Sequence, residues 1–135
     1  MPIQPYLFFE GRCDDAIAFY RTALGAEVTA LMRHGENPDG MQGAPGTEDK
    51  VMHAEIRIGD ATILASDGFC AAAARFQGFG LALNVPDTAT AERHFGALAE
   101  GGEVRMPLGR SFFSPCFGMV ADRFGVLWMV VAAPA

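Results

Sequence analysis

Positive charge and cysteine are both scarce in this sequence. Ten Lys and Arg residues stand against sixteen Asp and Glu, so the formal net charge is −6. Binding to a phosphate backbone needs clustered positive charge, and the sequence has no basic run, so we expect no nucleic-acid partner. The three widely spaced cysteines, Cys13, Cys70 and Cys116, fit neither a disulfide framework nor a CxxC metal knuckle. These absences together predict a reduced, cytoplasmic protein.

Long hydrophobic runs are also missing. No uncharged apolar stretch approaches the roughly 18 residues that a transmembrane helix requires, so we expect no membrane span. The first residues lack a charged segment followed by an apolar one, and no signal peptide is expected. Half of the residues are nonetheless apolar and 19% are charged, which is typical of a folded globular protein. The length of 135 residues suits one domain, which we predict to span residues 1–135.

The order of predicted secondary structure repeats along the chain. In each half, an apolar run is followed by a segment with apolar residues at helical spacing, and then by three more strand-like runs. In the first half these lie at residues 5–9, 14–24, 27–32, 53–58 and 61–66. In the second half they lie at residues 81–85, 88–99, 103–106, 117–121 and 126–131. Residues 33–50, with four Gly and two Pro, are predicted to form a long loop.

The two halves also match in sequence. Phe19-Tyr20 aligns with His94-Phe95, and Gly25-Ala26-Glu27-Val28 aligns with Gly101-Gly102-Glu103-Val104 after insertion of one residue. Repetition of a whole strand order indicates duplication of one module. We therefore predict an α+β fold of two tandem βαβββ modules, at about residues 1–67 and 79–135. Residues 68–78 would form the linker between them.

Three longer motifs follow one another along the chain. They are Pro5-Tyr6-Leu7-Phe8-Phe9-Glu10-Gly11-Arg12-Cys13-Asp14-Asp15-Ala16-Ile17-Ala18-Phe19-Tyr20 closed by Leu24-Gly25-Ala26-Glu27, then His53-Ala54-Glu55-Ile56-Arg57-Ile58, and finally Asp122-Arg123-Phe124-Gly125-Val126-Leu127-Trp128-Met129. In content and order these motifs resemble PhnB-like proteins, and the resemblance covers nearly the whole chain. That group is a branch of the vicinal oxygen chelate superfamily, which also includes glyoxalases, extradiol dioxygenases and bleomycin-resistance proteins.

The resemblance implies a curved mixed sheet in each module, with helices on the convex side and a pocket on the concave side. Metal-dependent members hold a divalent ion there, through His or Gln early in each module's first strand and Glu on each last strand. At the matching positions this chain offers Gln4 and Met129, with no ligand in residues 61–66 or 79–82. The cofactor stays open: the resemblance allows a divalent metal, but these positions do not support the usual four-residue site.

His53, Glu55 and Arg57 alternate with three apolar residues along one predicted strand. Because successive side chains on a strand point to opposite faces, these polar side chains should point toward the concave pocket. A His with a nearby carboxylate could serve as an acid–base pair or as part of a metal site. The alternative is a partly wet, hydrogen-bonded polar face without a catalytic role.

Three residues of the second module complete the predicted ligand pocket. Phe112, with Phe113, could line a pocket for a planar apolar ligand or cover a dimer interface. Cys116 aligns roughly with His53 and could be a nucleophile if its pKa were lowered, although a lone Cys is more often a small buried residue. Met129 stands where the superfamily carries its last-strand Glu.

Other features have no predicted part in chemistry. His34 and His94 are expected to be solvated. Trp128 is expected in the core, on the strand face opposite Met129. Residues 35–46 lack a phosphate-binding pattern, and they predict either a mobile lid over the pocket or a disordered loop.

Two functions from different classes fit these observations. The first is a PhnB-like protein that binds a small molecule in a concave pocket, with the usual metal site largely lost. The second is a metal-dependent lyase, isomerase or dioxygenase-like enzyme with an adapted site around His53 and Glu55. Loss of the ligand set favours binding, while the polar strand face favours residual chemistry. Members of the superfamily commonly form pairs, and the edge strands of each sheet need covering. Both points predict a twofold homodimer.

Overall fold

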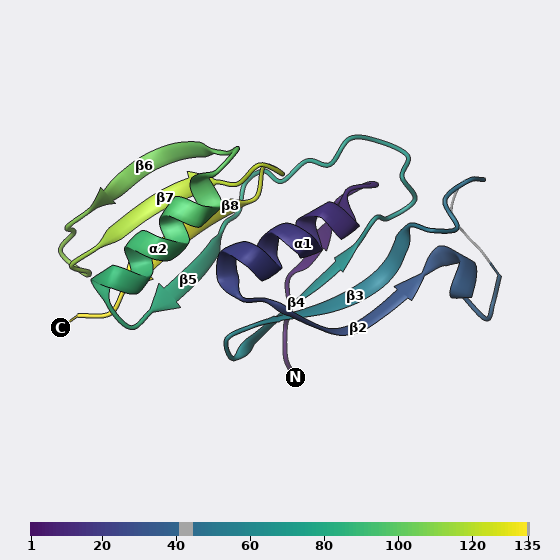
Figure 1. The fold of residues 1–135 in the computed structure, drawn as a ribbon, viewed down its shortest axis with the longest axis horizontal. Helices are drawn as coiled ribbons and strands as arrows, with labels where there is room; N and C mark the ends of the chain where they lie inside the picture. Colours follow the sequence, from purple (N-terminus) through teal and green to yellow (C-terminus); the bar gives the residue numbers. More distant parts are fainter. Residues whose placement is uncertain (41–44, 135) are drawn as a thin grey trace. The chain divides into compact units, whose positions relative to one another are not determined.

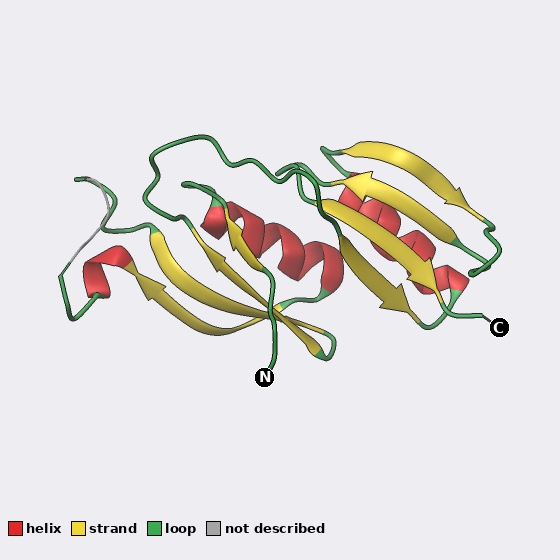
Figure 2. Ribbon diagram, turned by 180° about the vertical axis from the view of Figure 1, so that it is seen from behind, coloured by secondary structure: helices red, strands yellow, loops and turns green. Residues whose placement is uncertain are grey.

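The computed structural model describes residues 1–40 and 45–134. The chain divides into two compact units, Met1–Ala74 and Arg75–Ala135. Each unit is a four-stranded mixed sheet covered by an α-helix (Figures 1 and 2). This arrangement confirms the predicted α+β fold of tandem βαβββ modules, and the division falls within the segment predicted as linker. In the part of the chain described, no helix is both long enough and apolar enough to cross a membrane.

The first unit has its strands in the order β1-β4-β3-β2. Strand β1 runs parallel to β4, and the other neighbours are antiparallel. The predicted bounds hold to within two residues. The elements are β1 (Tyr6–Phe8), α1 (Cys13–Leu24), β2 (Glu27–Arg33), the 3-10 helix η1 (His34–Glu36), β3 (Val51–Ile58) and β4 (Ala61–Ser66).

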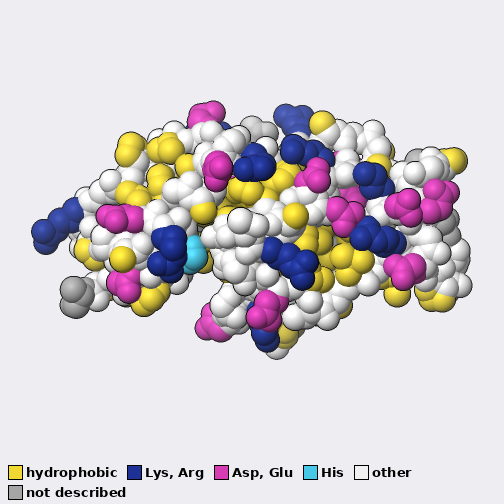
Figure 3. Space-filling view, in the orientation of Figure 1, with side chains coloured by type: hydrophobic (Ala, Val, Ile, Leu, Met, Phe, Trp, Pro, Cys, Tyr) yellow, Lys and Arg dark blue, Asp and Glu magenta, His cyan; other side chains and the backbone are white. Residues whose placement is uncertain are grey.

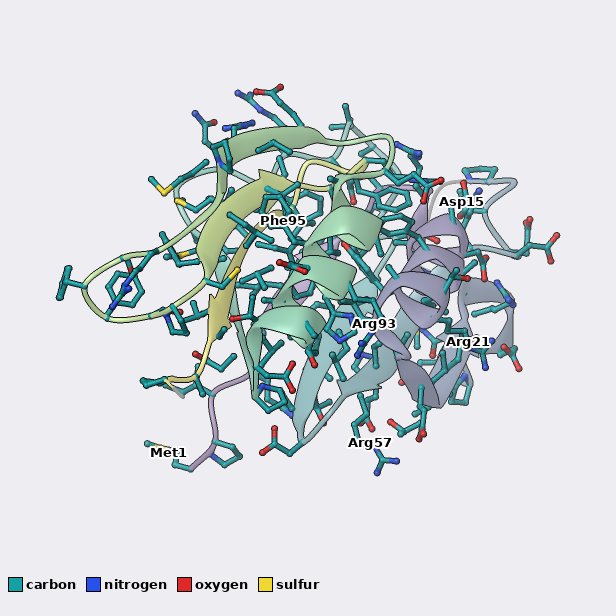
Figure 4. All side chains as sticks on the ribbon, turned by 60° about the vertical axis from the view of Figure 1, so that its left-hand side comes forward. Met1, Asp15, Arg21, Arg57, Arg93 and Phe95 are labelled. Carbon is teal, nitrogen blue, oxygen red and sulfur yellow. The ribbon has the colours of Figure 1, made fainter. Side chains whose placement is uncertain are left out.

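Helix α1 forms because its apolar residues recur at helical spacing and can all be buried against the sheet. Its buried side chains include Ile17, Phe19 and Tyr20, while Asp15 and Arg21 lie on its exposed side (Figure 4). The helix ends at Leu24, as predicted, and Gly25 forms its C-cap. Gly25 has a φ of 67°, a left-handed conformation that glycine adopts without steric penalty.

Strand β3 carries the clean alternation expected from the sequence. Ala54, Ile56 and Ile58 are buried on the face that α1 covers. The intervening residues are partly or fully exposed on the opposite face, which is called the open face of the first sheet from here on. Burial of the apolar face drives the sheet onto the helix. A one-residue shift in register would reverse both faces, so this alternation fixes which side chains are available for function.

The second unit repeats the design, with strands in the order β5-β8-β7-β6. The N-cap of its helix is Asp87, whose carboxylate accepts the backbone N–H of Thr90 at 2.8 Å. Hydrogen bonds from Thr90 hold the pKa of Asp87 below its ordinary value. The elements are β5 (Leu81–Val85), α2 (Thr88–Ala99), β6 (Glu103–Gly109), β7 (Phe117–Ala121) and β8 (Leu127–Ala132).

Strand β6 is longer than predicted, because it continues past Met106 through Pro107 to Gly109. A proline lacks a backbone N–H, but β6 is an edge strand, where a missing donor is tolerated. The core of this unit lies between α2 and its sheet. Phe95 packs from α2 onto the strands (Figure 4), and Trp128 is only 2% exposed. Trp128 is therefore a core residue on the face opposite Met129, as predicted.

The segment between β2 and β3 differs from the prediction in one respect. His34 was expected to be solvated, but it begins η1 and is buried, with 4% of its surface exposed. The polar, glycine-rich flanks of this residue gave no sign of burial, because the contact that covers it comes from Gly68, far along the chain. Residues 41–44, part of the predicted lid, lie outside the described residues.

Candidate functional site

The open face of the first sheet carries an aromatic pair next to a histidine. Leu7 of β1 is buried on the helix side, so Tyr6 and Phe8 project from the open face. Their rings stack with centroids 4.9 Å apart. The Tyr6 hydroxyl lies 2.7 Å from Nδ1 of His53 on β3. This hydrogen bond joins β1 to β3 across β4.

The Tyr6 hydroxyl occupies one of the two ring nitrogens of His53. The pKa of Tyr6 is raised, first because burial disfavours the phenolate and second because of the Cys13 sulfur. The phenol can donate to Nδ1 or accept from it, according to the tautomer of His53. In either case Nδ1 of His53 is engaged by the Tyr6 hydroxyl.

Glu55 and Arg57 share the open face with His53, as predicted, but their partners lie elsewhere. The hydroxyl of Thr29 on β2 donates to Oε2 of Glu55 at 3.3 Å. The guanidinium of Arg57 forms an ion pair with Glu27, at 2.6 Å between exposed side chains, and projects into solvent in Figure 4. His53 bonds toward β1 while Glu55 bonds toward β2, so the hydrogen bonds of the proposed acid–base residues diverge.

The open face of the second sheet is apolar and rich in methionine. Met129 of β8 is paired in register with Met119 of β7, which in turn is paired with Met106 of β6. These three residues are called the methionine row. Phe117 follows on the same face of β7. Thioether side chains are flexible and polarizable, and they adapt to apolar ligands of irregular shape. Sequence reasoning missed Met106 and Met119, although their alternating positions on predicted strands were a usable signal.

Cys116 and Phe112 lie in different surroundings. Cys116 precedes β7 on the side of Gly118 and Val120, which α2 covers, so it does not share a face with Met129. Burial, with a smaller effect of Glu92, raises the pKa of the Cys116 thiol. A raised pKa lowers the thiolate fraction and disfavours a nucleophilic role. Phe112 is fully exposed.

An aromatic series nevertheless connects Phe112 to the second sheet. Its ring meets Phe113 edge-on, with centroids 5.1 Å apart. Phe113 meets Phe117 in the same way at 5.0 Å. Phe117 lies on the open face next to the methionine row, so the series leads from the loop 110–116 onto that face. A cavity of about 400 Å³ opens on the same loop, between Arg110 and Pro115.

Two further cavities lie within single units. One of about 630 Å³ in the second unit is lined by Phe76, Phe79 and Arg105, among others. One of about 260 Å³ in the first unit is lined by Tyr6, Phe8 and His34, among others. None of the six predicted pocket residues lines either of these two cavities. The structure thus brings His53, Glu55 and Arg57 together on one sheet face, and places Met129 on the open face of the other sheet.

The donor atoms on the two open faces do not match the superfamily's metal ligands. Within residues 1–40 and 45–134, no three His, Cys, Asp or Glu residues are grouped to hold an ion. On the first sheet, Nδ1 of His53 is engaged by Tyr6. On the second, the methionine row offers thioethers, which are poor ligands for hard divalent ions. Among the described residues, the donor atoms on these two faces therefore do not form a four-ligand set for a divalent ion.

Comparisons with known proteins agree with this architecture. The family model of the Glyoxalase/Bleomycin resistance protein/Dioxygenase superfamily matches residues 3–130. Protein YjdN of Escherichia coli (strain K12) is 36% identical over 138 residues, which cover 96% of this chain and 94% of YjdN. Protein PA1353 of Pseudomonas aeruginosa is 42% identical, with a TM-score of 0.87 over 98% of each chain. The PhnB protein of Bacillus cereus is 28% identical, with a TM-score of 0.82 over 98% of this chain and 100% of that one.

Fold, motifs and sequence similarity thus lead to one conclusion. The chain belongs to the Glyoxalase/Bleomycin resistance protein/Dioxygenase superfamily. Within this superfamily its place is the PhnB-like branch, because similarity to the Bacillus cereus PhnB protein extends over almost the whole chain.

Proposed function

We propose that this protein binds a small, partly aromatic molecule in a concave pocket and that the usual four-residue metal site is largely lost. The observation that carries the proposal is the methionine row on the open face of the second sheet, with Met106, Met119 and Met129 in register. An apolar face that alternates with a buried core face is unusual on a soluble sheet unless something covers it. Phe113 and Phe117 extend that surface with aromatic rings suited to a planar ligand.

The methionine row consists of uncharged side chains, which suits a ligand without strong net charge. Figure 3 views the second unit from its α2 side, where acidic and basic side chains are interspersed with apolar ones. The diverging hydrogen bonds of His53 and Glu55 favour a binding role over acid–base chemistry at the first sheet.

The proposal is tested with 1-naphthol as probe and with the methionine methyl groups as reporters. In methyl-labelled protein, we expect saturable NMR shifts at Met119 and Met129, with a Kd on the order of 0.1 mM. Met1, in the exposed N-terminal segment, serves as the internal control. A Met129→Ala variant should bind several-fold more weakly, whereas Val104→Ala, on edge strand β6, should bind as the wild type does.

The same samples test the loss of the metal site. After incubation with zinc, nickel or manganese and dialysis, we expect well under one ion per chain by mass spectrometry. Uptake of one ion per chain that is abolished by His53→Ala would refute this part of the proposal. Absence of any shift at Met119 and Met129 with 1-naphthol would refute the binding site on the second sheet.

We also propose that the protein forms a homodimer. Large apolar side chains are exposed at several places, including Met106 on edge strand β6 and Phe112 in the loop before β7. Unpaired edges and apolar side chains of this kind are commonly covered by a second copy. Light scattering at about 10 μM should give about twice the chain mass of 14.4 kDa. A monomeric mass at that concentration would contradict the proposal.

A further inference from the structure

His34 is a buried side chain with an incomplete set of hydrogen bonds. Its Nε2 lies 2.8 Å from the carbonyl oxygen of Gly68. A carbonyl oxygen can only accept, so Nε2 carries the proton and donates it. In the neutral ring, Nδ1 is then a bare acceptor. Among the described residues, Nδ1 of His34 has no hydrogen-bond partner.

An unpartnered buried acceptor is unfavourable unless something else satisfies it. The sequence predicted a solvated His34, and water would then satisfy its Nδ1. The structure instead buries it in η1, with 4% of its surface exposed. A hydrogen-bond donor from outside the described residues is the partner that this atom lacks.

His34 lines the cavity of about 260 Å³ in the first unit. This volume is close to the lower end of the usual range for small-molecule sites, roughly 300 Å³, which suits one or two fused rings. The stacked rings of Tyr6 and Phe8 form part of the lining. Phe69 and Met52 form another part, and Phe69 is 61% exposed. Aromatic walls of this kind favour a planar ligand.

The part of the cavity that holds His34 is ordered by hydrogen bonds. The backbone N–H of Gly68 donates to the Ser66 hydroxyl oxygen at 2.8 Å. The neighbouring Asp67 carboxylate accepts three backbone N–H groups, from Gly11, Cys13 and Val51. These contacts hold the Gly68 carbonyl in place, and that carbonyl determines the tautomer of His34. The acceptor is therefore present before any ligand arrives.

We propose that this cavity binds a small, neutral, planar molecule that donates a hydrogen bond from a ring N–H or hydroxyl to Nδ1 of His34. Neutrality follows from the described lining, which contains aromatic, polar and thioether side chains but no Lys, Arg, Asp or Glu. Because Nδ1 is buried, a donor reaches it only when the cavity wall rearranges. The lining residues of this cavity all belong to the first unit, and the proposal does not depend on the methionine row.

The test compares two ligands of nearly equal shape on the full-length protein. Indole has a ring N–H, and benzofuran replaces that N–H with an oxygen that cannot donate. We expect indole to bind with a Kd on the order of 1 mM and benzofuran about fivefold more weakly. Intermolecular NOEs from indole should reach the Met52 methyl group, which lies in the cavity wall.

Variants separate the hydrogen bond from the aromatic wall. His34→Phe keeps a flat ring but removes the acceptor, so the ratio of the two affinities should fall to about one. If that variant does not fold, Phe69→Ala carries the test, because an exposed ring can be removed safely. Phe69→Ala should weaken both ligands and preserve their ratio. The matched control is Phe79→Ala, an exposed phenylalanine of the second unit, which should change neither affinity.

Several outcomes would overturn the proposal. These are equal binding of indole and benzofuran, unchanged indole affinity in a folded His34→Phe variant, and no NOE to Met52. Saturation of neither ligand at 5 mM, about five times the expected Kd, would overturn it as well. The proposed function is tested with 1-naphthol and the methyl groups of Met119 and Met129. A negative result with indole therefore does not bear on the proposed function.

Discussion

An Asp67→Asn variant is expected to lose about 3 kcal/mol of unfolding free energy. The Asp67 side chain is fully buried. Its Oδ1 accepts the N–H groups of Gly11 and Cys13 at 2.8 and 2.7 Å, and its Oδ2 accepts the N–H of Val51 at 2.8 Å. Asparagine has almost the same shape but one acceptor oxygen. Its amide group would therefore direct an N–H toward a backbone N–H that now has no acceptor.

The size of this effect follows from what the three bonds connect. They join the loop before α1, the first residue of α1 and the first residue of β3 to the end of β4 through one carboxylate. Hydrogen bonds to a charged group are stronger than neutral ones, and a buried donor left unsatisfied adds its own desolvation penalty. Water cannot replace the lost partner at a fully buried position without opening the unit.

Urea unfolding followed by far-ultraviolet circular dichroism measures the change. Asp60→Asn is the matched control, because Asp60 lies exposed in the turn between β3 and β4. The control should stay within about 0.5 kcal/mol of the wild type. If Asp67→Asn does so too, the Asp67 carboxylate does not hold the first unit together through these three hydrogen bonds.

A Trp128→Phe variant should lose about 3 kcal/mol as well, through a different unit and a different mechanism. The indole Nε1–H of Trp128 donates to Oδ2 of Asp122 at 2.9 Å, and both side chains are buried. Phenylalanine removes this charge-assisted hydrogen bond and leaves unfilled volume in the core between α2 and the sheet.

Asp122 uses its other oxygen to accept the backbone N–H groups of Phe124 and Val126, at 2.9 and 3.1 Å. The carboxylate thus closes the turn between β7 and β8 and positions Trp128 at the same time. A double-mutant cycle with Asp122→Asn isolates the contact between the two side chains.

We expect a coupling free energy of about 1–2 kcal/mol between Asp122 and Trp128. Circular dichroism is again the measurement, because Trp128 is the single tryptophan of the chain and its fluorescence is lost in the variant. Strictly additive effects of Trp128→Phe and Asp122→Asn would show that the hydrogen bond contributes nothing beyond the packing of the ring.

Neither Asp67 nor Asp122 was predicted from the sequence to be a buried structural residue. Asp122 was predicted only as part of a turn and of the motif that carries the family resemblance, and Asp67 was assigned no role. An aspartate in a glycine-containing turn is usually exposed, because turns lie at the surface. The donors that bury Asp67 come from residues 16 to 56 positions away, and local patterns carry no information on partners so distant.

The candidate site, too, could be predicted only in part from the sequence. Alternation along β3 predicted that His53, Glu55 and Arg57 share one face, and burial in the sheet agrees. The partners of these side chains could not be predicted. Tyr6 reaches His53 from a strand 47 residues earlier, and only the strand order β1-β4-β3-β2 brings the two together.

Cys116 illustrates how sensitive such predictions are to register. It was aligned roughly with His53, which would place both on an open face. The strand period is two, so an alignment error of one residue moves a side chain to the opposite face of the sheet. The pairing of Met119 with Met129 shows that the open-face positions of β7 are Phe117 and Met119. Cys116 lies instead on the side that α2 covers.

The sequence by itself determined the secondary structure, the duplication and the superfamily. These depend on the spacing of apolar residues, on glycine at helix ends and on contiguous motifs, all of which are local or periodic. The tertiary structure alone decided the burial of His34, the bond between Tyr6 and His53, and the methionine row. Each of these depends on which strands become neighbours and in which register. That choice is made by burial of apolar surface over the whole unit, which no short stretch of sequence contains.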